Sequence, residues 1–280
     1  MNRTISLIIL IIIGLCNAAF AAPPQRIISL APSTTEVLFA LGLGDRVVGV
    51  TTFCDYPAEA KAKPKIGGMS NPSLEAIVSL KPDLVVMTMD GNPREIEDRL
   101  RSLKISTHVF TSRTLAELPQ GIRAIGAATG AVIRGESLAK EMESALAAVR
   151  LRAHDSVRKH ASPLKRKVLF IVWPEPLIVA GPGTAIGDAI DLLGLENTAA
   201  NANTTYPRYS IEEVIRQAPD VLFIGKGSGM NMHAVAKGIL KKISTVPAVK
   251  NNNVCYVGDG LYRLGPRVVQ GIEELAACLK

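Results

Sequence analysis

Residues 73–86, SLEAIVSLKPDLVV, and residues 210–223, SIEEVIRQAPDVLF, are two versions of one pattern that lie 137 residues apart. Each version begins with a serine that can cap a helix by accepting a backbone N–H, and a first-turn glutamate suits the positive end of the helix dipole. Pro-Asp then ends the helix, because proline cannot continue it, and a short apolar strand follows. A supersecondary unit that recurs once at this distance predicts two similar α/β lobes in one chain.

Strand and helix patterns alternate around both copies of the repeat. The first half has strand patterns over 26–30, 46–50, 84–87 and 107–110, and helix patterns over 36–41 and 94–103. The second half has strand patterns over 167–173, 177–180 and 253–257, and helix patterns over 188–193 and 266–279. Such alternation is typical of parallel-type sheets flanked by helices. At the start of the first helix, Ser33 is expected to be the N-cap and Glu36 to complete a capping box.

A long helical pattern separates the two lobes. Its apolar positions follow a 3.6-residue period at Leu138, Met142, Ala145, Leu146 and Val149. A helix of about 25 residues would be nearly 40 Å long, so we expect a rigid brace rather than a flexible hinge. We therefore divide the chain into an N-terminal α/β lobe (22–130), a connecting helix (131–162) and a C-terminal α/β lobe (163–280).

The first 21 residues have the features of a secretory signal peptide. Arg3 precedes an apolar run from Ile5 to Cys16, and the small residues of the Ala19–Ala21 segment follow as a cleavage site. The run is shorter than the roughly 20 residues that a membrane-spanning helix needs. A lipoprotein anchor at Cys16 would need a small residue before it, but Leu15 stands there. We expect cleavage after Ala21 and a soluble periplasmic protein, and we favour this over the lipoprotein anchor.

The charge of the chain is basic, but its distribution does not favour nucleic acid. The chain has 32 Lys and Arg against 25 Asp and Glu, a net charge of +7, and loss of Arg3 with the signal peptide leaves +6. Many basic residues cluster within 150–167, where no aromatic residues are interleaved. Together with export, this favours a solvated helix face and linker over a nucleic-acid site. We expect no nucleic-acid partner.

Motifs of enzymes and of metal sites are missing from the sequence. It contains no G-x-S-x-G elbow and no P-loop, and the glycines of 181–187 have the wrong spacing for a dinucleotide site. The four histidines, His108, His154, His160 and His233, show no paired spacing. We therefore expect no catalytic residues, no metal site and no resident cofactor, and an exported α/β enzyme is the least favoured alternative.

Three cysteines remain after removal of the signal peptide: Cys54, Cys255 and Cys278. In an oxidising compartment one pair can form a disulfide and leave an odd thiol. Cys255 with Cys278 is the favoured pair because both lie in the second lobe, but the sequence leaves the pairing open.

Ligands of α/β proteins bind beyond the carboxyl ends of the strands. The residues just past the predicted strands are Pro32, Ser33, Phe53, Asp55, Tyr56, Gly67, Met69, Met87, Met89, Asp90, Trp173, Glu175, Tyr206, Arg208, Lys226, Asp259, Tyr262 and Arg263. From these, the candidate ligand-binding residues are Pro32, Ser33, Phe53, Asp55, Tyr56, Gly67, Met87, Tyr206, Asp259, Tyr262 and Arg263. Flat apolar groups with a few charges suit a large, partly apolar ligand with polar edges.

The order of several motifs resembles a known family. RIISLAPSTTE at 26–36, VGV at 48–50, DYP at 55–57, Gly67 and the first repeat resemble the helical-backbone (class III) periplasmic binding proteins of ABC importers. The resemblance covers nearly all of the mature chain, and it is closest to the cobalamin-binding members. It implies a monomeric two-lobed body that captures cobalamin or a related corrinoid. It also implies delivery to an ABC permease in the inner membrane.

The resemblance also assigns roles to individual residues. Glu75 and Glu212 match the glutamates that dock these proteins onto the permease, one in each lobe, although the helix dipole alone could explain a glutamate there. Segments 55–57, 206–207 and 259–263 match those that line the corrin cleft. The best-known cobalamin binder has tryptophans at the positions of Gly67, Met87, Tyr206 and Gly260. Because this aromatic wall is reduced, heme or a ferric siderophore remains the alternative ligand.

Overall fold

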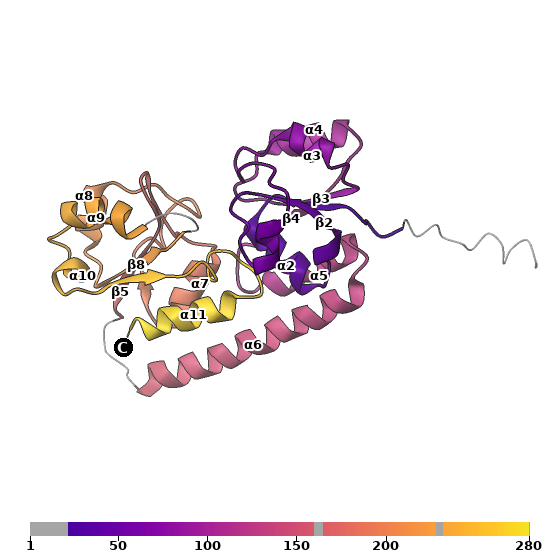
Figure 1. Cartoon of the computed structure of the whole chain (residues 1–280). Coiled ribbons are helices and arrows are strands. Elements are labelled where there is room, and N and C mark those ends of the chain that lie inside the picture. Colours follow the sequence, from indigo (N-terminus) through magenta and orange to yellow (C-terminus); the bar gives the residue numbers. More distant parts are fainter. Residues whose placement is uncertain (1–21, 160–164, 228–231, 280) are drawn as a thin grey trace, which may run out of the picture.

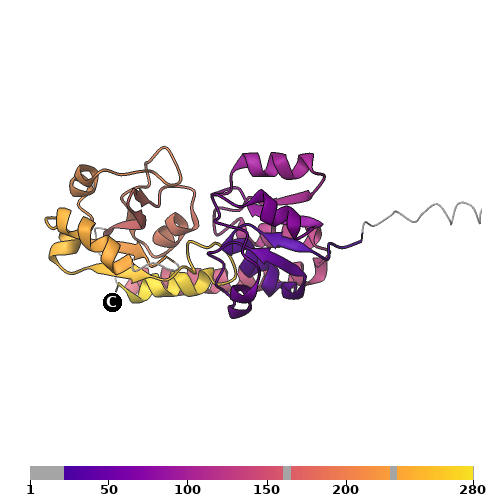
Figure 2. The same ribbon diagram turned by 45° about the horizontal axis from the view of Figure 1, so that its top comes forward.

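The computed structural model describes residues 22–159, 165–227 and 232–279, with side chains left undescribed for 154–159. The predicted signal peptide (1–21) and the end of the predicted connecting segment (160–162) lie outside the described residues. The predicted fold class is confirmed, because two α/β lobes stand side by side along one long helix (Figures 1 and 2).

The N-terminal lobe has a fully parallel sheet of order β2-β1-β3-β4. Its strands are β1 (Ile27–Ser29), β2 (Val47–Val50), β3 (Leu84–Thr88) and β4 (Ser106–Phe110). Its helices are α2 (Pro32–Ala40), η1 (Gly44–Arg46), η2 (Ala58–Ala62), α3 (Leu74–Ser79), α4 (Arg94–Ser102) and α5 (Leu118–Ala128). Helices α3 and α4 cover one face of the sheet, and α2 and α5 cover the other (Figure 1).

The C-terminal lobe has a mixed sheet, in which β6 is antiparallel to β5 and the other pairs are parallel. Its strands are β5 (Lys167–Pro174), β6 (Leu177–Val179), β7 (Glu196–Asn197), β8 (Val221–Gly225) and β9 (Val254–Val257). Its helices are α7 (Ala185–Leu192), α8 (Ile211–Gln217), α9 (Met232–Lys242), α10 (Pro247–Lys250) and α11 (Val268–Ala277). The β5–β6 pair departs from the expected parallel pattern because a two-residue connection can join only antiparallel strands.

The repeat has the same local structure in both lobes. The side chain of Ser73 accepts the N–H of Ala76 at 3.2 Å, and that of Ser210 accepts the N–H of Glu213 at 3.1 Å. Both caps were predicted from the sequence. Each copy also passes through a residue with a φ of +47° immediately before its proline.

The aspartate of each copy fastens its strand to the neighbouring strand. Asp83 accepts the backbone N–H of Arg26 at 2.9 Å, next to the start of β1. Asp220 accepts the backbone N–H of Lys167, at the start of β5, also at 2.9 Å. The Pro-Asp pair therefore ends the helix and sets the register of the following strand, which explains why the pattern recurs as a unit.

Helix α6 (Val132–Lys159) joins the lobes. Its 28 residues correspond to about 42 Å. Leu138, Leu146 and Val149 are buried in a core cluster that contains residues of both lobes, including Phe110 and Phe170. The helix therefore braces the molecule, as the apolar stripe predicted. In the described part of the chain, no helix combines the length and the apolar character needed to cross a membrane.

Candidate functional site

A cleft with a volume of ≈ 340 Å³ lies between the lobes. It is lined by Pro32, Ser33, Phe53, Met69, Ser70, Thr88, Asp90, Phe110, Ser112, Arg113, Trp173, Ala185, Ile186, Tyr206, Gly227, Leu261, Tyr262, Arg263 and Leu264. Most of these groups are apolar or aromatic, and both lobes contribute. The cleft lies at the carboxyl ends of the strands, where α/β sheets bind ligands.

Six of the eleven candidate residues line this cleft: Pro32, Ser33, Phe53, Tyr206, Tyr262 and Arg263. Phe53 and Tyr206 remain 47% and 37% exposed, so the cleft offers apolar surface that a ligand could cover. Met69, Asp90 and Trp173, from the wider set beyond the strand ends, also line the cleft. Sequence reasoning missed Phe110, Ser112 and Arg113. The same rule would have found the last two, because they lie two and three residues past the end of β4.

The structure does not bring the other five candidate residues to the cleft wall. Met87 is only 2% exposed and packs under α3 and α4, because side chains of β3 alternate between the two faces of the sheet. Gly67 has a φ of +98°, and an added Cβ would lie 3.0 Å from a backbone oxygen, so its role here is conformational. Tyr56 lines a separate groove. Asp55 and Asp259 belong to an ion-pair network behind the cleft.

This ion-pair network joins the two lobes. Arg263 of the C-terminal lobe pairs with Asp55 of the N-terminal lobe at 2.5 Å and with Asp259 at 2.9 Å. Arg267 pairs with Asp259 at 2.9 Å and donates through Nε to Glu36 of the N-terminal lobe, also at 2.9 Å. Its Nη2 contacts the other oxygen of the same carboxylate. Arg263 and Arg267 therefore link carboxylates of the N-terminal lobe to a carboxylate of the C-terminal lobe.

Glu36 does not complete a capping box, contrary to the expectation from sequence. Helix α2 begins at Pro32, its N-cap is Ala31, and no side chain caps it, so Ser33 lies within the first turn. The Glu36 side chain is 1% exposed. Burial raises the pKa of Glu36, and the hydrogen bond and charge of Arg267 oppose that rise. The guanidinium of Arg267 also lies 4.2 Å from the centre of the Tyr56 ring, in a cation–π contact.

The N-terminal wall of the cleft contains a bidentate ion pair. Arg113 Nε lies 2.8 Å from Asp90 Oδ2, and Arg113 Nη2 lies 2.6 Å from Asp90 Oδ1. Tyr206 of the other lobe interacts electrostatically with both members of this pair. Although Tyr206 is 37% exposed, partial desolvation and the Asp90 carboxylate raise its pKa to about 12, and the charge of Arg113 opposes this rise.

The C-terminal wall presents fixed aromatic rings. The Tyr262 hydroxyl accepts the N–H of Gly227 at 2.7 Å, and the Trp173 indole donates to the carbonyl of Glu175 at 2.8 Å. Burial raises the pKa of Tyr262 to about 12 despite the bond from Gly227. The hydroxyls of Tyr206 and Tyr262 are therefore neutral hydrogen-bonding groups at physiological pH.

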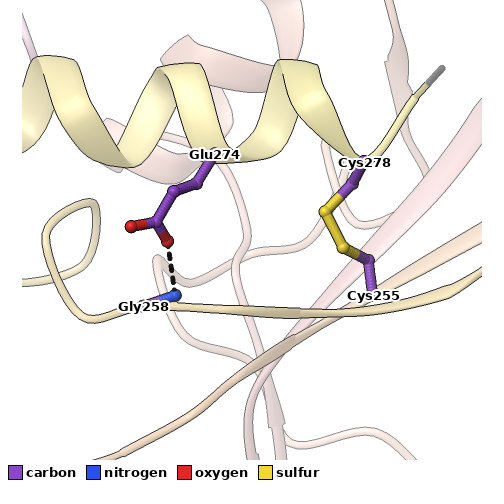
Figure 3. The surroundings of a disulfide bond; sticks show 4 residues. All are labelled: Cys255, Gly258, Glu274 and Cys278. Atoms are coloured by element: carbon purple, nitrogen blue, oxygen red, sulfur yellow. Dashed lines mark hydrogen bonds between the residues drawn. A yellow bond between two sulfur atoms is a disulfide. The ribbon is translucent and has the colours of Figure 1, made fainter.

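The segment that carries Asp259 and Arg263 is anchored at both of its flanks. Cys255 in β9 and Cys278 after α11 form a disulfide, with their Cα atoms 6.1 Å apart (Figure 3). Glu274 of α11 accepts the N–H of Gly258 at 2.8 Å (Figure 3). The cysteine pair favoured from sequence is confirmed, and Cys54 is a buried free thiol.

Glu75 and Glu212 are exposed in the first turns of α3 and α8. Figure 1 shows these two helices on the side of the molecule away from α6, one in each lobe. The backbone N–H and the Ser210 hydroxyl lower the pKa of Glu212. Within the described residues, no group of three or more histidine, cysteine, aspartate or glutamate side chains is placed to hold a metal ion.

Known proteins that resemble this chain over most of its length include several binding proteins. The model of a family described as periplasmic binding protein matches residues 27–260. An uncharacterized ABC transporter substrate-binding lipoprotein of Bacillus subtilis, YvrC, is 34% identical over 262 residues, which are 90% of this chain and 79% of that protein.

Solved structures with the same fold include binders of two kinds of macrocycle. The periplasmic vitamin B12 binding protein BtuF of Vibrio cholerae is 29% identical, with a TM-score of 0.77 over 92% of this chain and 97% of that one. The periplasmic heme-binding protein RhuT of Roseiflexus sp. RS-1, in its apo form, is 32% identical, with a TM-score of 0.79 over 91% of this chain and 97% of that one.

Proposed function

The chain belongs to the periplasmic binding protein family, and we propose that it captures cobalamin or a related corrinoid and delivers it to the permease of an ABC importer. Such proteins are transport components rather than enzymes. The observation that carries the proposal is the cleft between the lobes, which has aromatic and aliphatic walls from both lobes with hydroxyl and charged groups between them. A large, flat ligand with polar edges fits this composition.

The architecture suits tight capture without a large conformational change. Nanomolar affinity corresponds to about 12 kcal/mol, and burial of apolar surface contributes roughly 25 cal/mol per Å². The exposed rings of Phe53 and Tyr206 offer surface of this kind at the cleft. Because α6 and the Arg263–Asp55 ion pair hold the lobes together before the ligand arrives, little ordering cost remains at binding.

Heme is the second candidate because Met69, Tyr206 and Tyr262 line the cleft and a heme-binding protein shares the fold. A tyrosine ligates ferric iron as the phenolate. The pKa of about 12 at both tyrosines opposes that form. A ferric siderophore is the third ligand class.

Calorimetric titration of the mature protein with cyanocobalamin, with hemin as competitor, tests the ligand. One-to-one binding at nanomolar to low micromolar Kd supports the proposal. Tight hemin binding without cobalamin binding would make heme the transported molecule in place of cobalamin. A Soret band that shifts in Tyr206→Phe or Tyr262→Phe would then identify the side chain that ligates the iron. No response to either macrocycle would make siderophores the next probes.

We further propose that Glu75 and Glu212 dock the protein onto the permease, one per lobe. Their exposure and their equivalent places in α3 and α8 support this role. Glu75→Lys with Glu212→Lys should abolish uptake in cells and leave ligand affinity unchanged. The matched control is Glu95→Lys with Glu196→Lys, which reverses one exposed glutamate in each lobe elsewhere. Normal uptake by the first double variant would refute the docking role.

The mature form is proposed to be a monomer that begins at Ala22 in the periplasm. Mass spectrometry of the exported protein and light scattering test both statements. A lipid-modified amino terminus at Cys16 would establish the lipoprotein form instead.

A further inference from the structure

The guanidinium groups at the cleft are already paired with carboxylates of the protein itself. Of the described residues that line the cleft, three are charged: Asp90, Arg113 and Arg263. Arg113 donates two hydrogen bonds to Asp90, from Nη2 to Oδ1 at 2.6 Å and from Nε to Oδ2 at 2.8 Å. Both side chains remain partly exposed, at 38% and 36%, so the pair faces the cleft as a unit.

Arg263 is held more deeply. Its side chain is 8% exposed and contacts Asp55, Asp259 and, at 3.8 Å, Glu36. Behind it, Arg267 pairs with Glu36 and Asp259. None of these bonds needs a ligand, because every partner belongs to the protein.

The charges of the Asp90–Arg113 pair and of the ion-pair network around Arg263 and Arg267 do not favour the binding of an anionic ligand in the cleft. Three guanidiniums face four carboxylates, a balance of one negative charge when all are ionised. Neutral hydroxyls among the lining residues can donate and accept hydrogen bonds, and they belong to Ser33, Ser70, Thr88, Ser112, Tyr206 and Tyr262. Lys226 is exposed and precedes the lining residue Gly227, but it does not itself line the cleft.

We propose that this prepaired wall selects a macrocycle whose edge carries neutral amides and rejects the same macrocycle when the edge carries carboxylates. This inference rests on the proposed capture of a macrocycle in the cleft. An amide has a donor and an acceptor, so it can bond to the outer atoms of the Arg113–Asp90 pair without disturbing it. A carboxylate would be attracted by Arg113 but repelled by Asp90, and it would lose its hydration on entry.

The inference separates the two candidate macrocycles, corrinoid and heme, by the charge of their edges alone. The rim of a corrinoid carries neutral amide side chains, whereas heme carries two propionates that are anionic at neutral pH. Asp90 and Arg113 are therefore specificity-determining residues that act on the edge of the ligand. No metal ligation is needed for this discrimination.

The test compares ligands that differ only at the edge. Mature protein is titrated at low salt with cyanocobalamin and its monocarboxylate, and with hemin and its bis-amide. In each pair that binds, the acid should bind at least about tenfold more weakly than the amide. Asp90→Asn frees the Arg113 guanidinium and should bring the ratio to about one or reverse it. Lys226→Gln is the charge control and should leave the ratio unchanged.

The outcomes for the inference and for the proposed function are distinct. Equal affinity for acid and amide, or a ratio that Asp90→Asn does not change, would overturn the inference while corrinoid capture stands. Binding of only the porphyrin pair, with the bis-amide preferred, would overturn the corrinoid and support the inference. Binding of no macrocycle would overturn both.

Discussion

Replacement of Arg267 by alanine removes the main partner of a buried carboxylate that bridges the lobes. Glu36 is 1% exposed, and Arg267 donates to both of its oxygens. In the Arg267→Ala variant the nearest remaining guanidinium is that of Arg263, at 3.8 Å. In this variant the Glu36 carboxylate stays buried away from water but no longer accepts the hydrogen bonds from Arg267.

The expected cost follows from this geometry. Removal of one partner from a buried ion pair typically costs about 3–5 kcal/mol, because the other charge stays buried and uncompensated. Loss of the cation–π contact with Tyr56 adds about 0.5–1 kcal/mol. Asp259 keeps its bond to Arg263 and adds little. We expect the free energy of unfolding to fall by about 3.5–6 kcal/mol near pH 8.

The cost should depend on pH in a defined direction. Burial already raises the pKa of Glu36 above its usual 4.5, and Arg267 is the main group that opposes this rise. Without Arg267, the pKa in the folded state rises further. A carboxyl whose folded pKa exceeds its unfolded value stabilises the fold most below the unfolded value, and this contribution is lost as the pH rises through the folded pKa. The variant should therefore be closest to the wild type at and below pH 4.5.

Urea unfolding of the mature protein at pH 8 and pH 5 measures both effects. Glu36→Gln in the Arg267→Ala background should recover much of the loss at pH 8, since the buried charge is gone. Arg152→Ala is the matched control, because its pair with Glu273 is exposed and should be worth about 0–1 kcal/mol. A loss below about 1 kcal/mol at both pH values, or no rescue by Glu36→Gln, would refute the reasoning.

Two further predictions concern a helix cap and two tyrosines. Ser210→Ala should lower stability by about 1 kcal/mol, because the N–H of Glu213 loses its acceptor; a change within measurement error in urea unfolding would contradict the cap. Tyr206 and Tyr262 should ionise near pH 12, above the usual 10.0, as followed by near-ultraviolet absorbance. Since their folded pKa values are raised, the stability they contribute is present below pH 10 and lost as the pH rises through about 12. Loss of the two late-titrating groups in Tyr206→Phe with Tyr262→Phe would identify them, and ionisation of all tyrosines near pH 10 would contradict the burial.

The sequence by itself determined the features that depend on local chemistry and periodicity. The repeat predicted two capped helices, each followed by a Pro-Asp turn and a strand, because capping and helix termination act within a few residues. The apolar stripe predicted α6, because a 3.6-residue period places those side chains on one face. The rule that ligands bind beyond the strand ends placed Phe53, Tyr206 and Tyr262 at the cleft.

Tertiary structure alone decided which neighbouring residues reach the cleft and which support it. Met87 lies within β3, and the alternation of the strand buries it under α3 and α4, whereas Asp90, two residues past the end of β3, lies on the cleft wall. Glu36 and Arg267 are 231 residues apart, and no spacing in the sequence links them. Such pairs form only when the two lobes lie side by side. The strength of an ion pair depends on the distance between the two groups in space and on the burial of both, and sequence separation determines neither.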